Sequence, residues 1–173
     1  LIVCWTYLPL GYIAWGMKTI NLKYLIFSIL VSLSSSAIAG VTVRPIASPE
    51  ETLKRILIYK NLNFEPNFLI PEIRYASETQ LKDFQEDIEP QWGFKPNVIT
   101  NAFVWKLNRI YILDDAKYYQ STSRFIDDSI AHELTHYIQY KYRGWDLNDD
   151  SLEWDAIDTQ NWYRETYCLS QCK

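Results

Sequence analysis

The sequence predicts an α+β domain in which a small, mostly antiparallel sheet packs against helices. Three observations carry this prediction. Helix-start signals lie in the first half of the domain, a hairpin pattern covers residues 98–113, and two stretches of helical periodicity follow between residues 125 and 167. The resulting order of helix, strand, helix, hairpin, helix and helix is typical of a compact α+β domain.

Capping signals open the two helices of the first half. Ser48 is followed by Pro-Glu-Glu, a capping box with proline at the first helical position. Ser77 begins a similar Ser-x-x-Gln pattern before a second apolar periodic stretch. Between the helices, residues 72–76 predict a short strand. Residues 89–97 contain two prolines and a glycine, which predict a connection that could also border a cleft.

Residues 98–113 predict a β-hairpin. A run rich in β-branched and aromatic residues covers residues 98–105, Leu107 and Asn108 form the turn, and residues 109–113 form the returning strand. The hairpin directly precedes the helical part of the chain.

Two amphipathic helices are predicted in the C-terminal part. Apolar residues from Phe125 to Tyr142 recur at helical spacing, acidic residues suit the first turn, and Gly144 marks the end. The second helix covers residues 151–167, with Ser151 as its expected N-cap. Each helix has one apolar face with which it can pack against the rest of the domain.

The only two histidines of the chain, His132 and His136, lie in the first of these helices, and Glu133 directly follows the first histidine. Residues four apart lie on the same helical face, so both imidazoles can bind one metal ion while Glu133 points toward a further coordination position. Such a pattern can arise by chance, but the surrounding amphipathic helix supplies the context that a metal site requires. The pattern therefore predicts a metal centre with Glu133 as the catalytic residue.

The third metal ligand must be a carboxylate. A catalytic zinc ion usually takes three protein ligands and leaves a fourth position for water, and the chain has no third histidine. Glu153 lies in the first turn of the second helix, and the small Ala156 would let that helix approach the metal helix closely. Asp155 is the alternative ligand. Two residues apart on a helix, these side chains point about 200° apart, so both cannot face the same ion.

An HExxH motif followed by a glutamate on the next helix resembles the gluzincin branch of the zincin metallopeptidases, and the small size resembles the minigluzincins. The resemblance covers the C-terminal part of the chain. It implies a zincin-like fold with a metal-binding helix and a C-terminal ligand helix. It also implies a zinc-dependent peptidase with one Zn²⁺ per chain, bound by His132, His136 and Glu153, and with Glu133 as the general base toward a peptide or protein substrate.

The resemblance leaves the supporting residues open. In many gluzincins an aspartate four residues after the ligand glutamate supports a histidine, but Ile157 stands at that position here. The supporting role would then belong to one of the nearby polar residues of the second helix, which are Asp155, Asp158 and Gln160. Several side chains near the motif could stabilise an oxyanion, namely Tyr137, Tyr140, Tyr163, Tyr167 and Arg164.

In zincins the edge strand above the metal helix holds the substrate in an extended form, and such backbone pairing is a general mode of peptide recognition. The resemblance therefore implies a substrate-binding strand in the hairpin, for which we expect Arg109, Ile110 and Tyr111. A hairpin that only completes the sheet is the alternative.

Residues 17–39 predict a secretory signal peptide. The only methionine of the chain opens this segment, and lysines, an apolar run at residues 24–33 and an Ala-x-Ala site before Gly40 follow. The run is too short for a spanning helix, so a periplasmic or secreted protein is expected, with an N-terminal membrane anchor as the alternative. Residues 1–16 are expected to be an over-extended gene start, and residues 40–173 a single domain.

Composition bears on partners and redox state. With 17 basic and 21 acidic residues and no basic patch, the chain is not expected to bind nucleic acid. Outside the cytoplasm Cys168 and Cys172 could form a disulfide, although their spacing on a helix makes a bridge tight and leaves free thiols as the alternative.

Two other functions stay open, namely a zinc-containing binding module without turnover and a factor directed at one specific protein. Glu133 argues against the binding module, because a structural zinc site needs no such carboxylate.

Overall fold

The computed structural model describes residues 40–172. The expected extension at residues 1–16 and the expected signal peptide at residues 17–39 lie outside the described residues. Among residues 40–172, no helix is both long enough and apolar enough to cross a membrane.

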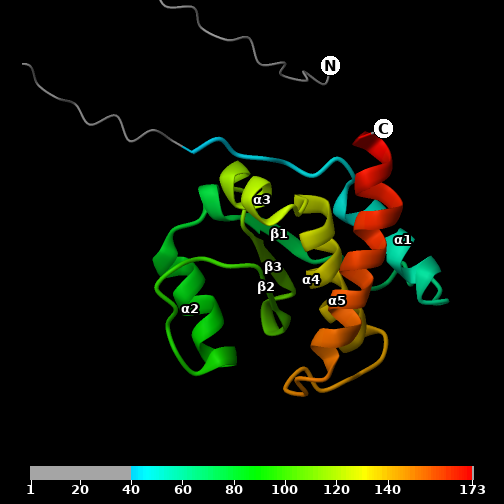
Figure 1. Cartoon of the computed structure of the whole chain (residues 1–173). Coiled ribbons are helices and arrows are strands. Elements are labelled where there is room, and N and C mark those ends of the chain that lie inside the picture. Colours follow the sequence, from blue (N-terminus) through cyan, green and yellow to red (C-terminus); the bar gives the residue numbers. More distant parts are fainter. Residues whose placement is uncertain (1–39, 173) are drawn as a thin grey trace, which may run out of the picture. The chain divides into compact units, whose positions relative to one another are not determined.

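The described part of the chain confirms the α+β class, with five α-helices and three strands (Figure 1). In chain order these are α1 (Pro49–Tyr59), β1 (Glu72–Tyr75), α2 (Leu81–Trp92), β2 (Ala102–Val104), β3 (Arg109–Ile112), α3 (Ala116–Thr122), α4 (Ile126–Lys141) and α5 (Leu152–Tyr163). A π-helical segment, Arg164–Cys168, continues α5. Helix α3 is the one α-helix that the sequence patterns do not predict.

The sheet is mixed, and this corrects the expected mostly antiparallel arrangement. Its strand order is β1-β3-β2. The hairpin is confirmed, because β2 and β3 pair in antiparallel fashion with Phe103 opposite Ile110. On its other side β3 pairs in parallel with β1, where Ile73 lies opposite Ile110. Strand β3 is therefore the central strand, and β2 is an edge.

Both faces of the sheet are covered, because alternate side chains of a strand point to opposite faces. Ile110 and Ile112 join the main core with residues of α1 and α4, whereas Tyr111 joins a second cluster with Phe84 and Ile88 of α2. Figure 1 shows α2 and α4 on opposite sides of the strands. Each fully buried apolar side chain of this kind stabilises the fold by about 1.5–3 kcal/mol.

Helix α4 is buried on nearly all sides, and polar contacts hold its first turn. Asp127 accepts hydrogen bonds from the backbone of Ile46 and Ala47, which anchors the start of the domain. Asp128 is 0% exposed and accepts hydrogen bonds from Gln160 Nε2 at 2.8 Å and Arg164 Nε at 2.7 Å. Because those donors lie in α5 and its continuation, Asp128 fixes α5 against the start of α4.

Of the three serines predicted to begin helices, Ser48 alone acts as a cap. Ser48 accepts a hydrogen bond from the Glu51 backbone, as predicted for α1. Ser77 does not cap α2, because its hydroxyl and its backbone N–H both donate to buried Asp114. At α5, Ser151 makes no side-chain capping bond, and the Asp149 carboxylate instead accepts from the Ser151 backbone.

Helix α2 extends into the stretch that the sequence marks as a connection. It passes Pro90 and ends at Trp92, followed by Gly93 in the left-handed region with φ +75. Proline removes only one backbone hydrogen bond here, and burial of Phe84 and Ile88 on the sheet holds the helix in place. The last turn of α2 is thereby positioned beside β2.

Cys168 is a buried free cysteine in the described part of the chain. Burial raises the pKa of its thiol to about 12, which keeps it protonated at neutral pH. The side chain of Cys172, its expected disulfide partner, lies outside the described residues.

Candidate metal centre

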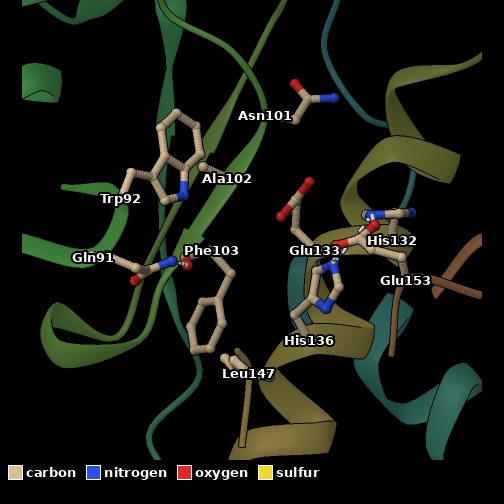
Figure 2. Close-up of a pocket in the computed structure, with 10 residues that line it drawn as sticks. All are labelled: Gln91, Trp92, Asn101, Ala102, Phe103, His132, Glu133, His136, Leu147 and Glu153. Atoms are coloured by element: carbon tan, nitrogen blue, oxygen red, sulfur yellow. Dashed lines mark hydrogen bonds and ion pairs between the residues drawn. The ribbon is translucent and has the colours of Figure 1, made fainter. Parts of the chain in front are cut away.

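Three side chains predicted as metal ligands converge on one point (Figure 2). Helix α4 presents His132 and His136 one turn apart, and the first turn of α5 brings Glu153 opposite them. The two histidine Nε2 atoms are 3.2 Å apart, and they lie 3.4 Å and 3.2 Å from the nearest carboxylate oxygens of Glu153. Together these groups could hold a metal ion.

The size of this triangle fits a four-coordinate ion. Ligand atoms about 2.0–2.2 Å from a tetrahedral metal lie about 3.3–3.6 Å from one another, by geometry and the usual zinc distances. The separations of 3.2, 3.2 and 3.4 Å, two of which run to different carboxylate oxygens of Glu153, lie near the lower end of that range. These three residues would hold the ion and would leave one of its four coordination positions without a protein ligand from this group.

Asp155 does not face the histidines. Its carboxylate accepts hydrogen bonds from Lys60 Nζ at 2.7 Å and from Gln139 Nε2 at 3.0 Å. Burial opposes ionisation of Asp155, but these two donors and the charge of Lys60 lower the pKa of its carboxyl. Asp155 is therefore a supporting residue, and Glu153 is the carboxylate that joins the histidines.

Gln139, which lies on α4, links Asp155 to His136. Its Nε2 donates to Asp155 and, at 2.9 Å, to the Leu152 carbonyl, which fixes the orientation of the amide. The Gln139 Oε1 atom therefore faces His136 Nδ1, 2.9 Å away, and accepts its N–H. With Nδ1 protonated, His136 offers the Nε2 lone pair to a metal.

His132 lacks such support. Its buried Nδ1 has no hydrogen-bond partner among the described residues. The other polar candidates on α5 act elsewhere, because Gln160 binds Asp128 and the side chain of Asp158 is exposed. The two histidines thus differ at Nδ1, because an amide oxygen accepts from that atom of His136 whereas no described group bonds to that atom of His132.

Glu133 lies in the cleft beside the two histidines and is 5% exposed. Burial raises the pKa of its carboxyl, and the negative charge of Glu153 acts in the same direction, against the attraction of His132 and His136. A carboxyl with a raised pKa holds a proton more readily than an exposed one. Such a group is suited to accept a proton and give it up again.

The ligand carboxylate has the opposite electrostatic character. Hydrogen bonds from His132 and then His136 hold the pKa of Glu153 well below its usual range. Burial acts to lower the pKa of His136, but its contact with Glu153 and the charge of Glu133 outweigh burial and raise it. Two carboxylates with opposite shifts thus stand within one site, and such a difference is common where groups have different chemical roles.

The cleft has a second wall that faces the metal ligands. The cleft between the two walls encloses about 250 Å³. Figure 2 shows residues of α2, of β2 and of the position before β2 across from the histidines, namely Gln91, Trp92, Asn101, Ala102 and Phe103. Sequence reasoning missed these residues, because Pro90 and Gly93 marked their neighbourhood as a connection and nothing local indicates which hairpin strand becomes an edge.

The residues predicted to bind substrate lie in the wrong strand for that role. Arg109, Ile110 and Tyr111 belong to central β3, whose backbone is paired on both sides. Ile110 and Tyr111 are 0% exposed, and Arg109 is held by Glu72 and Asp87. The edge strand beside the metal helix is β2, so the expected role can fall only to that strand.

The candidate oxyanion donors also have other partners. In the described part of the chain, the cleft is lined by none of Tyr137, Tyr140, Tyr163, Tyr167 and Arg164. Tyr137 donates to the Leu69 carbonyl, and Arg164 donates to Asp128. Both side chains therefore donate to other groups of the protein and stabilise the fold.

Comparison with known proteins adds no relative to this description. No protein-family model matches the chain, and neither do any curated protein or solved structure.

Proposed function

We propose that this protein is a zinc-dependent peptidase of the gluzincin kind. The observation that carries the proposal is the triangle of His132, His136 and Glu153 with the buried carboxylate of Glu133 beside it. Two imidazoles and one carboxylate are a common ligand set of catalytic zinc. When bound, zinc would supply Lewis-acid chemistry that polarises a carbonyl and lowers the pKa of a coordinated water.

The chain's own residues have distinct roles in this proposal. Glu133 would accept a proton on its carboxylate and pass it to the leaving amine, which its raised pKa favours. Gln139 would keep His136 in the tautomer whose Nε2 faces the metal. The wall of α2 and β2 would limit access of bulk water.

The same ligand set also holds ferrous iron in some oxygenases. Glu133 favours hydrolysis over that chemistry, because a peptidase needs a proton acceptor next to the metal and Glu133 lines the cleft between the two walls. The identity of the metal is therefore part of the test.

The test compares wild-type residues 40–173 with Glu133→Gln. The substitution keeps the shape and removes the proton acceptor, so casein cleavage should fall by at least about a hundredfold while the zinc content stays unchanged. Fluorescence release from labelled casein gives the rate, and elemental analysis of the same samples gives zinc and iron.

Several outcomes would contradict the proposal. Equal cleavage by both proteins would remove Glu133 from the mechanism. A wild-type protein that contains zinc but cleaves neither casein nor a peptide library would support a zinc-containing binding module instead. Iron in place of zinc would point to redox chemistry. Asp158→Ala, which changes an exposed carboxylate of α5, serves as the control and should retain wild-type activity.

A further inference from the structure

A side chain is hydrogen-bonded to the edge of β2 that does not pair with β3. Gln91, in the last turn of α2, donates from Nε2 to the Phe103 carbonyl at 3.0 Å and accepts from the Trp105 backbone N–H at 3.3 Å. One carboxamide thus makes the two backbone contacts that a neighbouring strand would make. Figure 2 shows Gln91 directed at Phe103 across the cleft from the histidines.

Gln91 also separates two hollows along this edge. One is the metal cleft, which contains Phe103 and both histidines. The other encloses about 180 Å³ and is lined by residues from α2, from the end of β2 and from the 3-10 turn Trp105–Leu107 that follows it, among them Pro90, Val104 and Leu107. Among residues 40–172, Gln91 is the one residue that lines both. An extended chain running along β2 from one hollow to the other would have to pass it.

We propose that Gln91 is a gate on the β2 edge, a specificity-determining residue that an extended peptide must displace before it can pair with Phe103 and Trp105. This inference rests on the proposed peptidase function. Without Gln91, water would bond to the Phe103 carbonyl and the Trp105 N–H, and an incoming strand could replace that water directly. The gate therefore weakens binding of every extended chain and favours chains whose further contacts offset the loss of both hydrogen bonds.

The chain offers a matched control. Gln85 lies on the same helix, and its Nε2 also donates to a backbone carbonyl, that of Pro96 at 2.8 Å. Gln85 lines neither hollow. Gln85→Ala therefore removes a similar hydrogen bond from α2 without opening the β2 edge.

The first measurement does not depend on catalysis. In Gln91→Ala the Trp105 amide loses its acceptor, so its hydrogen exchange should become at least about tenfold faster, while Gln85→Ala leaves that amide as in the wild type. Unchanged exchange at Trp105 would show that Gln91 does not close the edge and would overturn the proposal.

The second measurement uses fluorescein-labelled casein as an extended chain. Gln91→Ala should lower KM for its cleavage about three- to tenfold and leave kcat within about twofold, because the lost hydrogen bonds no longer compete with the substrate. Gln85→Ala should leave both constants unchanged. An unchanged KM, a raised KM or a loss of kcat alone would each overturn the gate.

Binding by the Glu133→Gln protein separates this inference from the proposed function. In that background, added Gln91→Ala should tighten binding of labelled casein by the same three- to tenfold, measured by fluorescence anisotropy. If the wild type cleaves nothing but binding still tightens, the peptidase proposal fails and the gate stands. Equal binding with and without Gln91, or no binding by either protein, overturns the gate.

Discussion

The two walls of the cleft are built in different ways. The metal wall consists of α4 and α5, and the fully buried carboxylate of Asp128 joins them. The substrate wall consists of α2 and β2. On this side Asp87 joins α2 to β3 through Arg109 and Tyr111, and its side chain is 22% exposed. We therefore expect the wall with the candidate metal ligands to be more rigid than the wall of α2 and β2.

The same difference appears in the polar contacts that reach the cleft. Behind the metal wall, Lys60 at the end of α1 donates to Asp155, and the chain of hydrogen bonds continues through Gln139 to His136. On the substrate wall, Gln91 binds only two backbone groups of the edge. A connected network is expected to fix geometry, whereas a single amide can be exchanged for another partner.

The largest stability effect is expected from Asp128→Ala. It leaves Arg164 and Gln160 without their buried acceptor and should lower the free energy of unfolding by about 3 kcal/mol. Urea unfolding measures this, and the control Asp158→Ala, which changes an exposed aspartate of α5, should cost less than about 0.5 kcal/mol. A small loss in Asp128→Ala would mean that packing alone fixes α5.

Gln139→Ala should weaken zinc binding about ten- to a hundredfold, the usual scale for losing a group that orients a metal ligand. Competition with a zinc-binding dye measures the affinity. Asp155→Ala should have a smaller effect, because Asp155 acts on His136 only through Gln139. Gln120→Ala, which changes an exposed glutamine, is the control. If it weakened zinc binding as much as Gln139→Ala, Gln139 would not be the residue that orients His136.

Asp87→Ala should have the smallest effect. Its hydrogen bonds are partly exposed, so we expect a loss of about 1 kcal/mol in the free energy of unfolding and no change in zinc affinity. Calorimetry gives the free energy of unfolding, and competition with the same dye gives the zinc affinity. If Asp87→Ala weakened zinc binding as strongly as Gln139→Ala, the two walls would not be independent.

The metal wall could be predicted largely from the sequence. The period of an α-helix places His132, Glu133 and His136 together without knowledge of the fold. Glu153 could be chosen over Asp155 because the two point in different directions on one helix, and Ala156 beside them is fully buried, as expected. Gln139, three residues after His136, has the spacing of a helical neighbour and could have been found by the same reasoning.

The substrate wall could not be predicted in this way. Pairing of Glu72 with Arg109 joins residues far apart in the sequence and makes β3 the central strand, and no local pattern encodes that choice. Helix α2 continues through Pro90 because its buried face outweighs the local breaker, and this carries Gln91 to the β2 edge. Tertiary contacts, more than local preference, decide this side of the cleft.

The zinc affinity of Glu153→Ala compared with wild-type protein tests the central claim most directly. The account predicts about one zinc per wild-type chain, none retained by His132→Ala or His136→Ala, and binding weakened by at least about a hundredfold in Glu153→Ala. Asp155→Ala should keep its zinc with a modest loss of affinity. Wild-type protein folded with zinc that retains none, or Glu153→Ala with wild-type affinity, would contradict the assignment of the metal centre.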